Sequence, residues 1–345
     1  MSTGFQAVQW NAAKYKYDVI LLSAVAGYLV GFIWIAATLQ PPKTEPEWID
    51  LRIRAFGTCA FLMLTVILCI GPLARLNPKF LPLLYNRRHF GVLFFLVACL
   101  HASSMVQWFA VQDALPSLVD ELTNWGNYLK FIGFPFKTLG IVALTIFFLM
   151  AATSHDYWLG FLKPPVWKAL HMLVYAAYGL IVVHVALGIM QRDHSPLIPL
   201  MLGASLALVA TLHTLAGWRE RKGDLASRTG DDGWLHVGPA RSIEDKRATI
   251  VTAPAGERIA VYRDGNQIGA LSNLCAHQNG PIGEGCIVDG LVTCPWHGYQ
   301  YRLADGCAPP PFTEKLVTYR VRLRDGIIEI DPRPLPPGTP AAIKL

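Results

Sequence analysis

Two short segments near the C-terminal end of the chain each carry one Cys and one His. One residue separates Cys275 from His277, two separate Cys294 from His297, and sixteen lie between the segments. Two thiolates and two imidazoles on adjacent loops suit an iron–sulfur centre in which one iron takes both Cys and the other both His. The same side chains could hold a structural zinc ion, although zinc sites usually pair Cys with Cys. The spacing therefore predicts a metal centre and favours the iron–sulfur cluster.

The residues around these ligands resemble the two cluster loops of the Rieske ferredoxin family. The matching segments are Asn-Leu-Cys-Ala-His-Gln-Asn-Gly-Pro-Ile at 273–282 and Cys-Pro-Trp-His-Gly-Tyr-Gln-Tyr-Arg at 294–302. The resemblance extends over about 234–332. It implies a Rieske-type [2Fe–2S] cluster held by Cys275, His277, Cys294 and His297.

Strand patterns surround the cluster segments. Residues 258–263 and 267–272 alternate around Asp264-Gly265, and residues 317–323 and 327–331 around Asp325-Gly326, as hairpins do. We expect a small all-β domain at 234–335, followed by a tail at 336–345.

Some positions depart from the high-potential branch of the family. The disulfide cysteines of that branch would fall at Gly280 and Trp296, and Tyr299 replaces a Ser that hydrogen-bonds the cluster, whereas Tyr301 is kept. Fewer hydrogen bonds to sulfur favour the oxidised cluster, so we expect a potential on the order of −150 mV. We interpret the remaining Cys286 and Cys307 as free thiols, with a disulfide between them as the alternative.

The first two thirds of the chain are strongly apolar. Hydrophobic residues make up 53% of 345 residues, and mean hydropathy is +0.35. Six runs approach or exceed the roughly 20 residues that cross a bilayer as a helix. They lie at 19–39, 55–74, 90–111, 131–154, 169–191 and 196–217. We predict an α-helical bundle of six transmembrane helices at 1–217, joined to the β domain by a short linker at 218–233.

Positive charge in alternate loops sets the expected orientation. Lys and Arg are about twice as numerous in the loops on the side that holds both termini as in the loops on the other side. Loops rich in Lys and Arg usually face the cytoplasm, so we expect both termini there. The chain is thus expected to be multi-pass in the bacterial inner membrane, with the β domain cytoplasmic. The net charge of +6 follows largely from this bias, so no nucleic-acid partner is expected.

Histidine recurs inside the apolar runs, where ionisable side chains are costly. The third and fifth runs cross in the same direction, and their histidines are 12 and 13 residues apart, roughly 18 to 20 Å along a helix. That spacing permits two levels of facing histidines, each suited to a bis-histidine haem b. His89 would face His171 near the cytoplasm, and His101 would face His184 farther out. His155 and His213 are alternative inner ligands or helix-end residues.

Residues 15–218 resemble the ferric reductase-like transmembrane family. The resemblance rests on Gly-Pro-Leu-Ala-Arg-Leu at 71–76, Arg-Arg-His-Phe-Gly at 87–91, Thr-Leu-Gly-Ile at 138–141 and Trp-Lys-Ala-Leu-His-Met-Leu-Val-Tyr at 167–175. The closest branch is the haem-binding membrane subunit of the bacterial periplasmic methionine sulfoxide reductase system. The resemblance implies that His101, His171 and His184 bind haem, whereas His89 has no counterpart in that branch.

The chain is expected to act as an electron-transfer component of an oxidoreductase. It has no Gly-x-Gly-x-x-Gly opening a βαβ unit and no room for a 2-His-1-carboxylate iron domain. We expect a cytoplasmic reductase or ferredoxin to supply electrons, and a periplasmic protein or a quinone to receive them through the cluster and two haems. Quinol-driven transfer in the reverse direction is one alternative. A membrane-bound redox sensor or assembly subunit without net turnover is the other.

Overall fold

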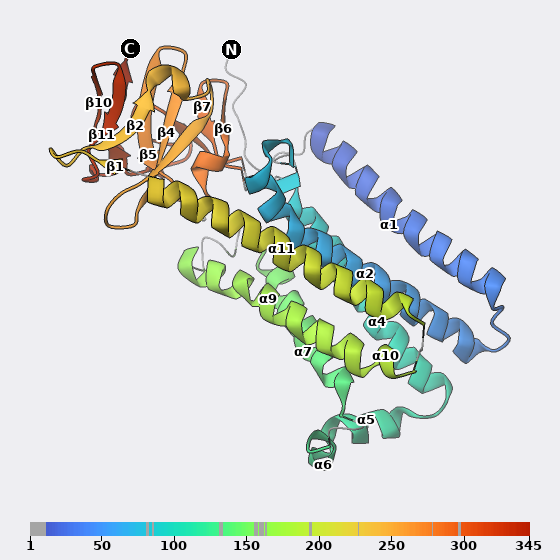
Figure 1. The fold of residues 1–345 in the computed structure, drawn as a ribbon. Helices are drawn as coiled ribbons and strands as arrows, with labels where there is room; N and C mark the ends of the chain where they lie inside the picture. The colour runs from blue at the N-terminus through green and yellow to red at the C-terminus, as the bar shows by residue number, and fades with distance from the viewer. Residues whose placement is uncertain are drawn as a thin grey trace. The chain divides into compact units, whose positions relative to one another are not determined.

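The computed structural model describes residues 12–80, 83–84, 86–130, 134–154, 158, 162, 164–192, 195–226, 228–277, 279–295 and 298–345. The chain divides into two compact units. One comprises the described residues of 12–70 and 86–211, and the other comprises those of 71–84 and 212–345. Figure 1 labels their helices and strands.

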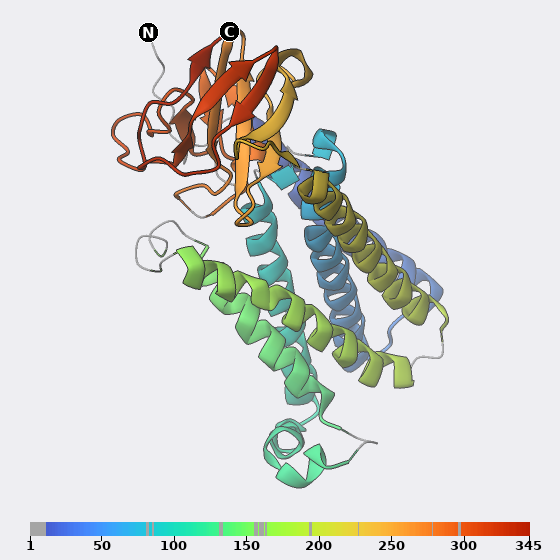
Figure 2. The same cartoon turned by 60° about the vertical axis from the view of Figure 1, so that its left-hand side comes forward.

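Long helices form where the sequence is apolar. They are α1 (Ala12–Leu39), α2 (Glu45–Leu76), α4 (Arg87–Val111), α7 (Phe136–Ala152), α9 (Pro164–Leu187) and α11 (Leu197–Ala226). Shorter helices are η1 (Pro78–Phe80), α5 (Leu115–Thr123), α6 (Trp125–Tyr128) and α10 (Ile189–Arg192). In the first unit α7 lies along α9 and also packs on α4 (Figures 1 and 2).

Five of the described helices are long and apolar enough to cross a membrane, whereas the sequence predicts six. The fourth predicted span, at 131–154, forms α7, which has 17 residues and begins after Pro135. A helix of that length measures about 26 Å, slightly less than a hydrocarbon core of about 30 Å. The count of six is therefore approximate, and α7 is the short member.

The predicted linker at 218–233 is helical in its first part, because α11 continues through Ala226. Residues 218–226 read Trp-Arg-Glu-Arg-Lys-Gly-Asp-Leu-Ala, in which good helix formers outnumber the single Gly. Its charged residues, Gly and Ser predicted a linker there, but charged residues extend a helix as readily as they fill a loop.

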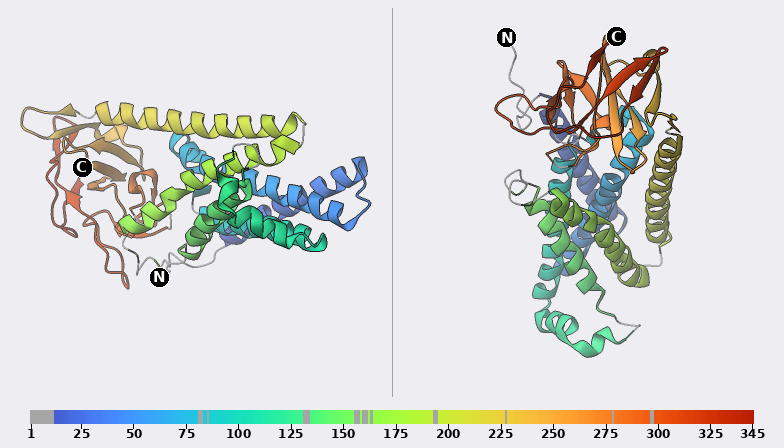
Figure 3. Two further views of the ribbon diagram at one scale, coloured as in Figure 1. Left: turned by 90° about the horizontal axis from the view of Figure 1, so that it is seen from below. Right: turned by 90° about the vertical axis from the view of Figure 1, so that its left-hand side faces the viewer.

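The described residues of the β domain form three antiparallel sheets, and Figure 3 draws this domain in orange to red. The first has the order β1-β2-β11-β10, from Arg228–Thr229, Leu235–Pro239, Ile327–Ile330 and Val321–Arg324. The second has the order β12-β5-β4-β3, from Ile343–Lys344, Gln267–Ser272, Arg258–Asp264 and Ala248–Thr252, and β9 (Thr318–Tyr319) also pairs with β5. The third is β6-β7-β8, from Cys286–Val288, Leu291–Thr293 and Gln300–Arg302. The short helices η2 (Ala240–Ser242) and η3 (Ile282–Glu284) connect strands.

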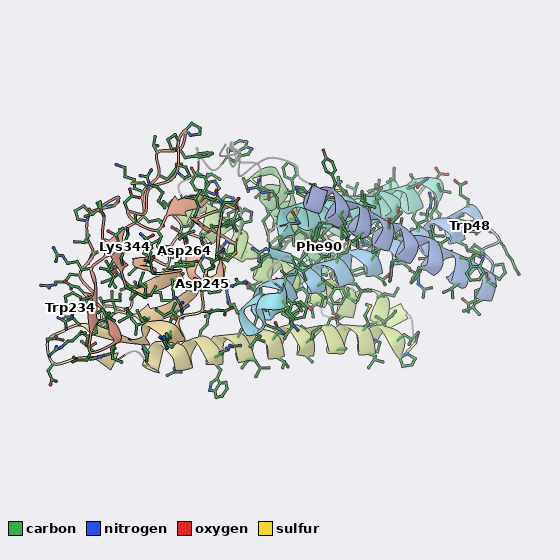
Figure 4. All side chains as sticks on the ribbon, turned by 90° about the horizontal axis from the view of Figure 1, so that it is seen from above. Trp48, Phe90, Trp234, Asp245, Asp264 and Lys344 are labelled. Carbon is green, nitrogen blue, oxygen red and sulfur yellow. The ribbon has the colours of Figure 1, made fainter. Side chains whose placement is uncertain are left out.

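Both predicted hairpins form. Asp264 pairs with Gln267 across the first turn, and Arg324 pairs with Ile327 across the second. Asp325 and Gly326 have φ values of 51° and 77°, as a two-residue type I′ turn requires. Figure 4 labels Asp264 at the first turn together with Asp245, whose Oδ1 accepts a hydrogen bond from Gly265 N at 2.8 Å.

The predicted strand at 317–323 divides between two sheets. Thr318 and Tyr319 pair with β5, and Val321 through Arg324 pair with β11. Alternating hydrophobicity predicts extended backbone but does not reveal that a strand changes partners.

The central strand β4 supplies both cores of the β domain. Ile259 and Val261 join the core beneath β2 and β11, and Ala260 and Tyr262 join the core that contains Cys275 and Cys294. Because successive side chains of a strand point to opposite faces, one continuous apolar run can serve both cores.

Gly285 closes the turn into β6, where a Cβ atom would overlap the carbonyl oxygen of Thr293. We predict that Gly285→Ala destabilises the β6–β7 pairing by about 3 kcal/mol or more, because the backbone must move. Hydrogen–deuterium exchange of peptides covering 286–302 in the full chain measures the effect. Gly290→Ala is the control, since Gly290 has φ +76° and open space around its Cβ position, and should cost only about 1–2 kcal/mol. Equal exchange in the two variants would contradict the prediction.

Candidate functional site

Two loops of the β domain carry the predicted cluster ligands. The first connects β5 to η3 and contains Cys275, and the second connects β7 to β8 and contains Cys294. Both cysteines are 1% exposed and belong to one hydrophobic core. The fold thus places two thiols from distant sequence positions in a water-poor environment.

Each loop turns tightly beneath its cysteine. Asn279 N donates to Cys275 O at 2.7 Å, and Gly298 N donates to Cys294 O at 2.9 Å. Asn279 and Gly298 both have left-handed backbone, with φ of 56° and 69°, a conformation that Asn and Gly tolerate best. The two loops therefore share one turn geometry, which directs each thiol inward.

Tyr301 makes a side-chain hydrogen bond to one of the predicted cluster cysteines. Its hydroxyl lies 3.3 Å from Cys275 Sγ. Burial, followed by the Cys275 charge, raises the pKa of Tyr301, so the phenol stays protonated and can donate to a thiolate. This contact agrees with the role that the family resemblance implies for Tyr301.

Tyr299 and His277 form the aromatic part of the site. Their rings stack with centroids 4.7 Å apart and an angle of 11°, and Phe312 contacts the Tyr299 ring at 5.0 Å. Burial, followed by the neighbouring Glu314 carboxylate, raises the pKa of Tyr299. Tyr299 thus fixes the plane of an imidazole. The fourth predicted ligand, His297, lies outside the described residues, as does Trp296.

The membrane helices bring together His101 of α4 and His184 of α9. Their ring centroids are 6.3 Å apart and the rings are nearly perpendicular, at 87°. One metal ion ligated by both rings would need about this separation, namely two metal–nitrogen bonds of about 2 Å plus the depth of each ring. His101 and His184 are thus close together, as the sequence predicts for this pair.

Backbone carbonyls fix the tautomer of both rings. His101 Nδ1 lies 3.0 Å from Ile53 O, and His184 Nδ1 lies 2.9 Å from Phe136 O. A carbonyl oxygen can only accept, so each Nδ1 carries the hydrogen and each Nε2 keeps its lone pair. Nε2 is therefore the atom that each ring offers to a metal.

Two glycines make room for these rings. A Cβ atom at Gly57 would lie 2.9 Å from His101 Nδ1, and one at Gly140 would lie 3.0 Å from His184 Cε1. Each glycine stands four residues after the carbonyl that holds the ring, at Ile53 and Phe136. Both carbonyl-to-histidine intervals are 48 residues, so the α2–α4 and α7–α9 pairs build the same arrangement twice.

The predicted inner ligands His171 and His89 show the same tautomer. His171 Nδ1 donates to Trp167 O at 3.0 Å, its ring stacks on Trp167 at 3.8 Å, and its Nε2 is buried with no hydrogen-bond partner among the described residues. His89 Nδ1 lies 2.9 Å from both carboxylate oxygens of Asp18 on α1. His89 follows α4 residue Arg88 and precedes the buried Phe90, which Figure 4 labels.

The remaining histidines have other positions. His213 is half-buried on α11, and His236 pairs with Glu329 at 3.2 Å. His155 and His194 lie outside the described residues.

Sequence reasoning missed the partners that orient the imidazoles: Ile53 O, Phe136 O, Asp18 and the two glycines. A backbone carbonyl acceptor cannot be recognised from residue type, because every residue has one. The glycines could have been recognised, since Gly57 precedes His101 by the same 44 residues that separate Gly140 from His184.

Family models match both parts of the chain. Residues 56–182 match the ferric reductase like transmembrane component, and residues 233–320 match the Rieske [2Fe-2S] domain. The first match includes His101 and His171 and ends two residues before His184. The second includes all four predicted cluster ligands.

The relatives that match this chain are similar to its β domain. The anthranilate 1,2-dioxygenase ferredoxin subunit of Burkholderia cepacia is 37% identical over 26% of this chain and 81% of its own length. The 3-phenylpropionate/cinnamic acid dioxygenase ferredoxin subunit of Escherichia coli is 34% identical over 28% of this chain and 92% of its own length. A chain from the complex of reduced oxygenase and oxidised ferredoxin in carbazole 1,9a-dioxygenase is 26% identical, with a TM-score of 0.28, over 30% of this chain and 96% of that one.

These matches, the buried cysteine pair and the apolar helices describe a multi-pass membrane protein with an electron-transfer role. The chain belongs to the Rieske [2Fe–2S] family, and its Rieske domain follows a ferric reductase-like transmembrane component.

Proposed function

We propose that this protein carries electrons across the bacterial inner membrane, from a cytoplasmic reductase or ferredoxin to a periplasmic protein or a quinone. A Rieske [2Fe–2S] cluster and b-type haem would each accept and release one electron. The observation that carries the proposal is the facing pair of His101 and His184, each with Nδ1 fixed and Nε2 available.

The residues of both sites fit these groups. Cys275 and Cys294 are buried thiols with a phenol donor beside one of them, a setting that suits a sulfur-ligated cluster. In the membrane, His171 Nε2 is a buried nitrogen without a described partner, and such a nitrogen gains stability from a ligand. His101, His171 and His184 would hold haem, and His89, whose Nδ1 donates to a carboxylate, has the arrangement typical of metal-binding imidazole.

Fixed imidazoles also favour rapid electron transfer. Main-chain carbonyls hold His101 and His184 in one orientation, so the rings need not turn when the charge of a bound group changes. The cytoplasmic position of the Rieske domain is part of the proposal, because it follows from the Lys and Arg bias of the loops.

We predict that His101→Ala and His184→Ala remove the same haem, because each leaves the other imidazole without its partner. Reduced-minus-oxidised spectra and haem quantification of the purified protein measure this loss, which is half of the total if two haems are present. His171→Ala should remove the other haem. His236→Ala, in the β domain, is the control and should retain both. Loss of different haems in the first two variants would refute the pairing.

The glycine beside His184 gives a second test. We predict that Gly140→Ala lowers haem retention because its Cβ would meet the His184 ring, although Ala normally stabilises a helix by about 1 kcal/mol relative to Gly. Gly179→Ala on α9 is the matched control, since nothing lies within 4 Å of its Cβ position. Haem content after gel filtration reports the difference. Equal retention in both variants would contradict a tight fit between Gly140 and His184.

Tyr301 provides a test of the cluster. We predict that Tyr301→Phe lowers the cluster midpoint potential by about 20–65 mV, because a hydrogen bond of about 0.5–1.5 kcal/mol to the thiolate is lost. A potentiometric titration followed by electron paramagnetic resonance measures the shift. Tyr319→Phe is the control, because the Tyr319 ring lies in the other core and its hydroxyl donates to Glu257, so its loss should leave the potential unchanged. An unchanged potential in Tyr301→Phe would exclude the proposed donation.

Reduction of the haem by a soluble donor distinguishes an electron carrier from a sensor. If the donor reduces the haem of the wild-type protein only when the cluster is present, net transfer follows. If the cluster is reduced and the haem stays oxidised, a sensor or assembly role is the better explanation.

A further inference from the structure

Lys137 occupies an unfavourable position. It is the second residue of α7, where the positive end of the helix dipole opposes a cation. Its side chain is only 11% exposed, and a partly desolvated charge in a membrane helix is costly. Both the helix dipole and the partial desolvation are unfavourable for the Lys137 ammonium, so another interaction must stabilise it.

The partner is Glu121 of α5. Lys137 Nζ lies 2.6 Å from both carboxylate oxygens of Glu121. The same ammonium lies 4.8 Å from the ring centroid of Phe136 and 5.4 Å from that of Phe109. The charge is thus held in one place between a carboxylate and two aromatic rings, which strengthens its field relative to a charge in water.

This fixed charge is close to His184. The Phe136 ring lies 5.3 Å from the His184 ring, so with the 4.8 Å separation of Lys137 Nζ from Phe136 the ammonium lies within about 10 Å of the imidazole. Lys137 also follows directly the residue whose carbonyl accepts from His184 Nδ1.

The other half of the site repeats this order. Arg54 follows Ile53, whose carbonyl accepts from His101 Nδ1. In both helix pairs, therefore, the carbonyl that orients the imidazole is followed in sequence by a basic residue.

We propose that the Lys137–Glu121 pair sets the reduction potential of the group held by His101 and His184. The inference rests on the proposed function and concerns how that site is tuned. Reduction by one electron adds a negative charge, which the Lys137 cation stabilises and the Glu121 carboxylate opposes. At about 10 Å and an effective dielectric constant of 20, one charge changes an equilibrium constant roughly tenfold. Lys137 would therefore not touch that group, and would act on it through the electric field of its charge at His184.

Opposite charge changes at one ion pair test the proposal. The full-length protein with bound haem is titrated potentiometrically, and the wave of interest is the one that His184→Ala abolishes. Glu121→Gln leaves Lys137 uncompensated and should raise the midpoint potential, whereas Lys137→Met should lower it. Each shift corresponds to up to roughly a tenfold change in the reduced-to-oxidised ratio, or 59 mV for a one-electron couple. Lys137→Arg keeps the charge and should stay near the wild-type value.

Asp120→Asn is the matched control. It removes the same charge from the same helix, but Asp120 is exposed, so water and salt screen it and the shift should be much smaller. Shifts of the same sign in Glu121→Gln and Lys137→Met, or no shift in either, would overturn the proposal and leave the pair as a structural tie between α5 and α7. A wild-type protein that binds no haem would instead refute the proposed function, so the two failures are distinguishable.

Discussion

The membrane site depends on one kind of hydrogen bond, from an imidazole Nδ1 to a fixed oxygen. His101, His171 and His184 donate to main-chain carbonyls, and His89 donates to a carboxylate. Such a bond contributes only about 0.5–1.5 kcal/mol to stability. It nevertheless decides which nitrogen of each ring remains available, and so it decides whether two histidines on neighbouring helices can serve one metal. The glycines beside His101 and His184 follow from this requirement, because a side chain at Gly57 or Gly140 would meet the imidazole that reaches across from the neighbouring helix.

The two parts of the chain position their ligands by different means. In the Rieske domain, left-handed turns at Asn279 and Gly298 hold the thiols against a hydrophobic core, so the geometry is encoded locally around each ligand. In the membrane domain, the predicted ligands His101 and His184 each depend on a carbonyl from another helix, so the geometry exists only after the helices pack.

This difference explains how much the sequence could predict. The cluster ligands, the two hairpins and the apolar runs follow from residue type and spacing. The pairing of His101 with His184 followed from the helical rise, and the structure places those rings together. The contact of His89 with Asp18 was not foreseen, because it joins residues 71 positions apart. The extension of α11 through Ala226 depended on local helix propensity, and the short span of α7 depended on Pro135. Counts of charge and hydropathy include neither effect.

The equal intervals in the two helix pairs have an evolutionary consequence. Each of α2–α4 and α7–α9 provides a carbonyl, a glycine four residues later and a histidine 48 residues after the carbonyl. Two such units, each supplying one ligand, are what duplication of an ancestral helical hairpin would leave. A primitive chain with a single hairpin would have needed a second copy of itself to assemble the same pair, and fusion of the copies would have made the site independent of protein concentration.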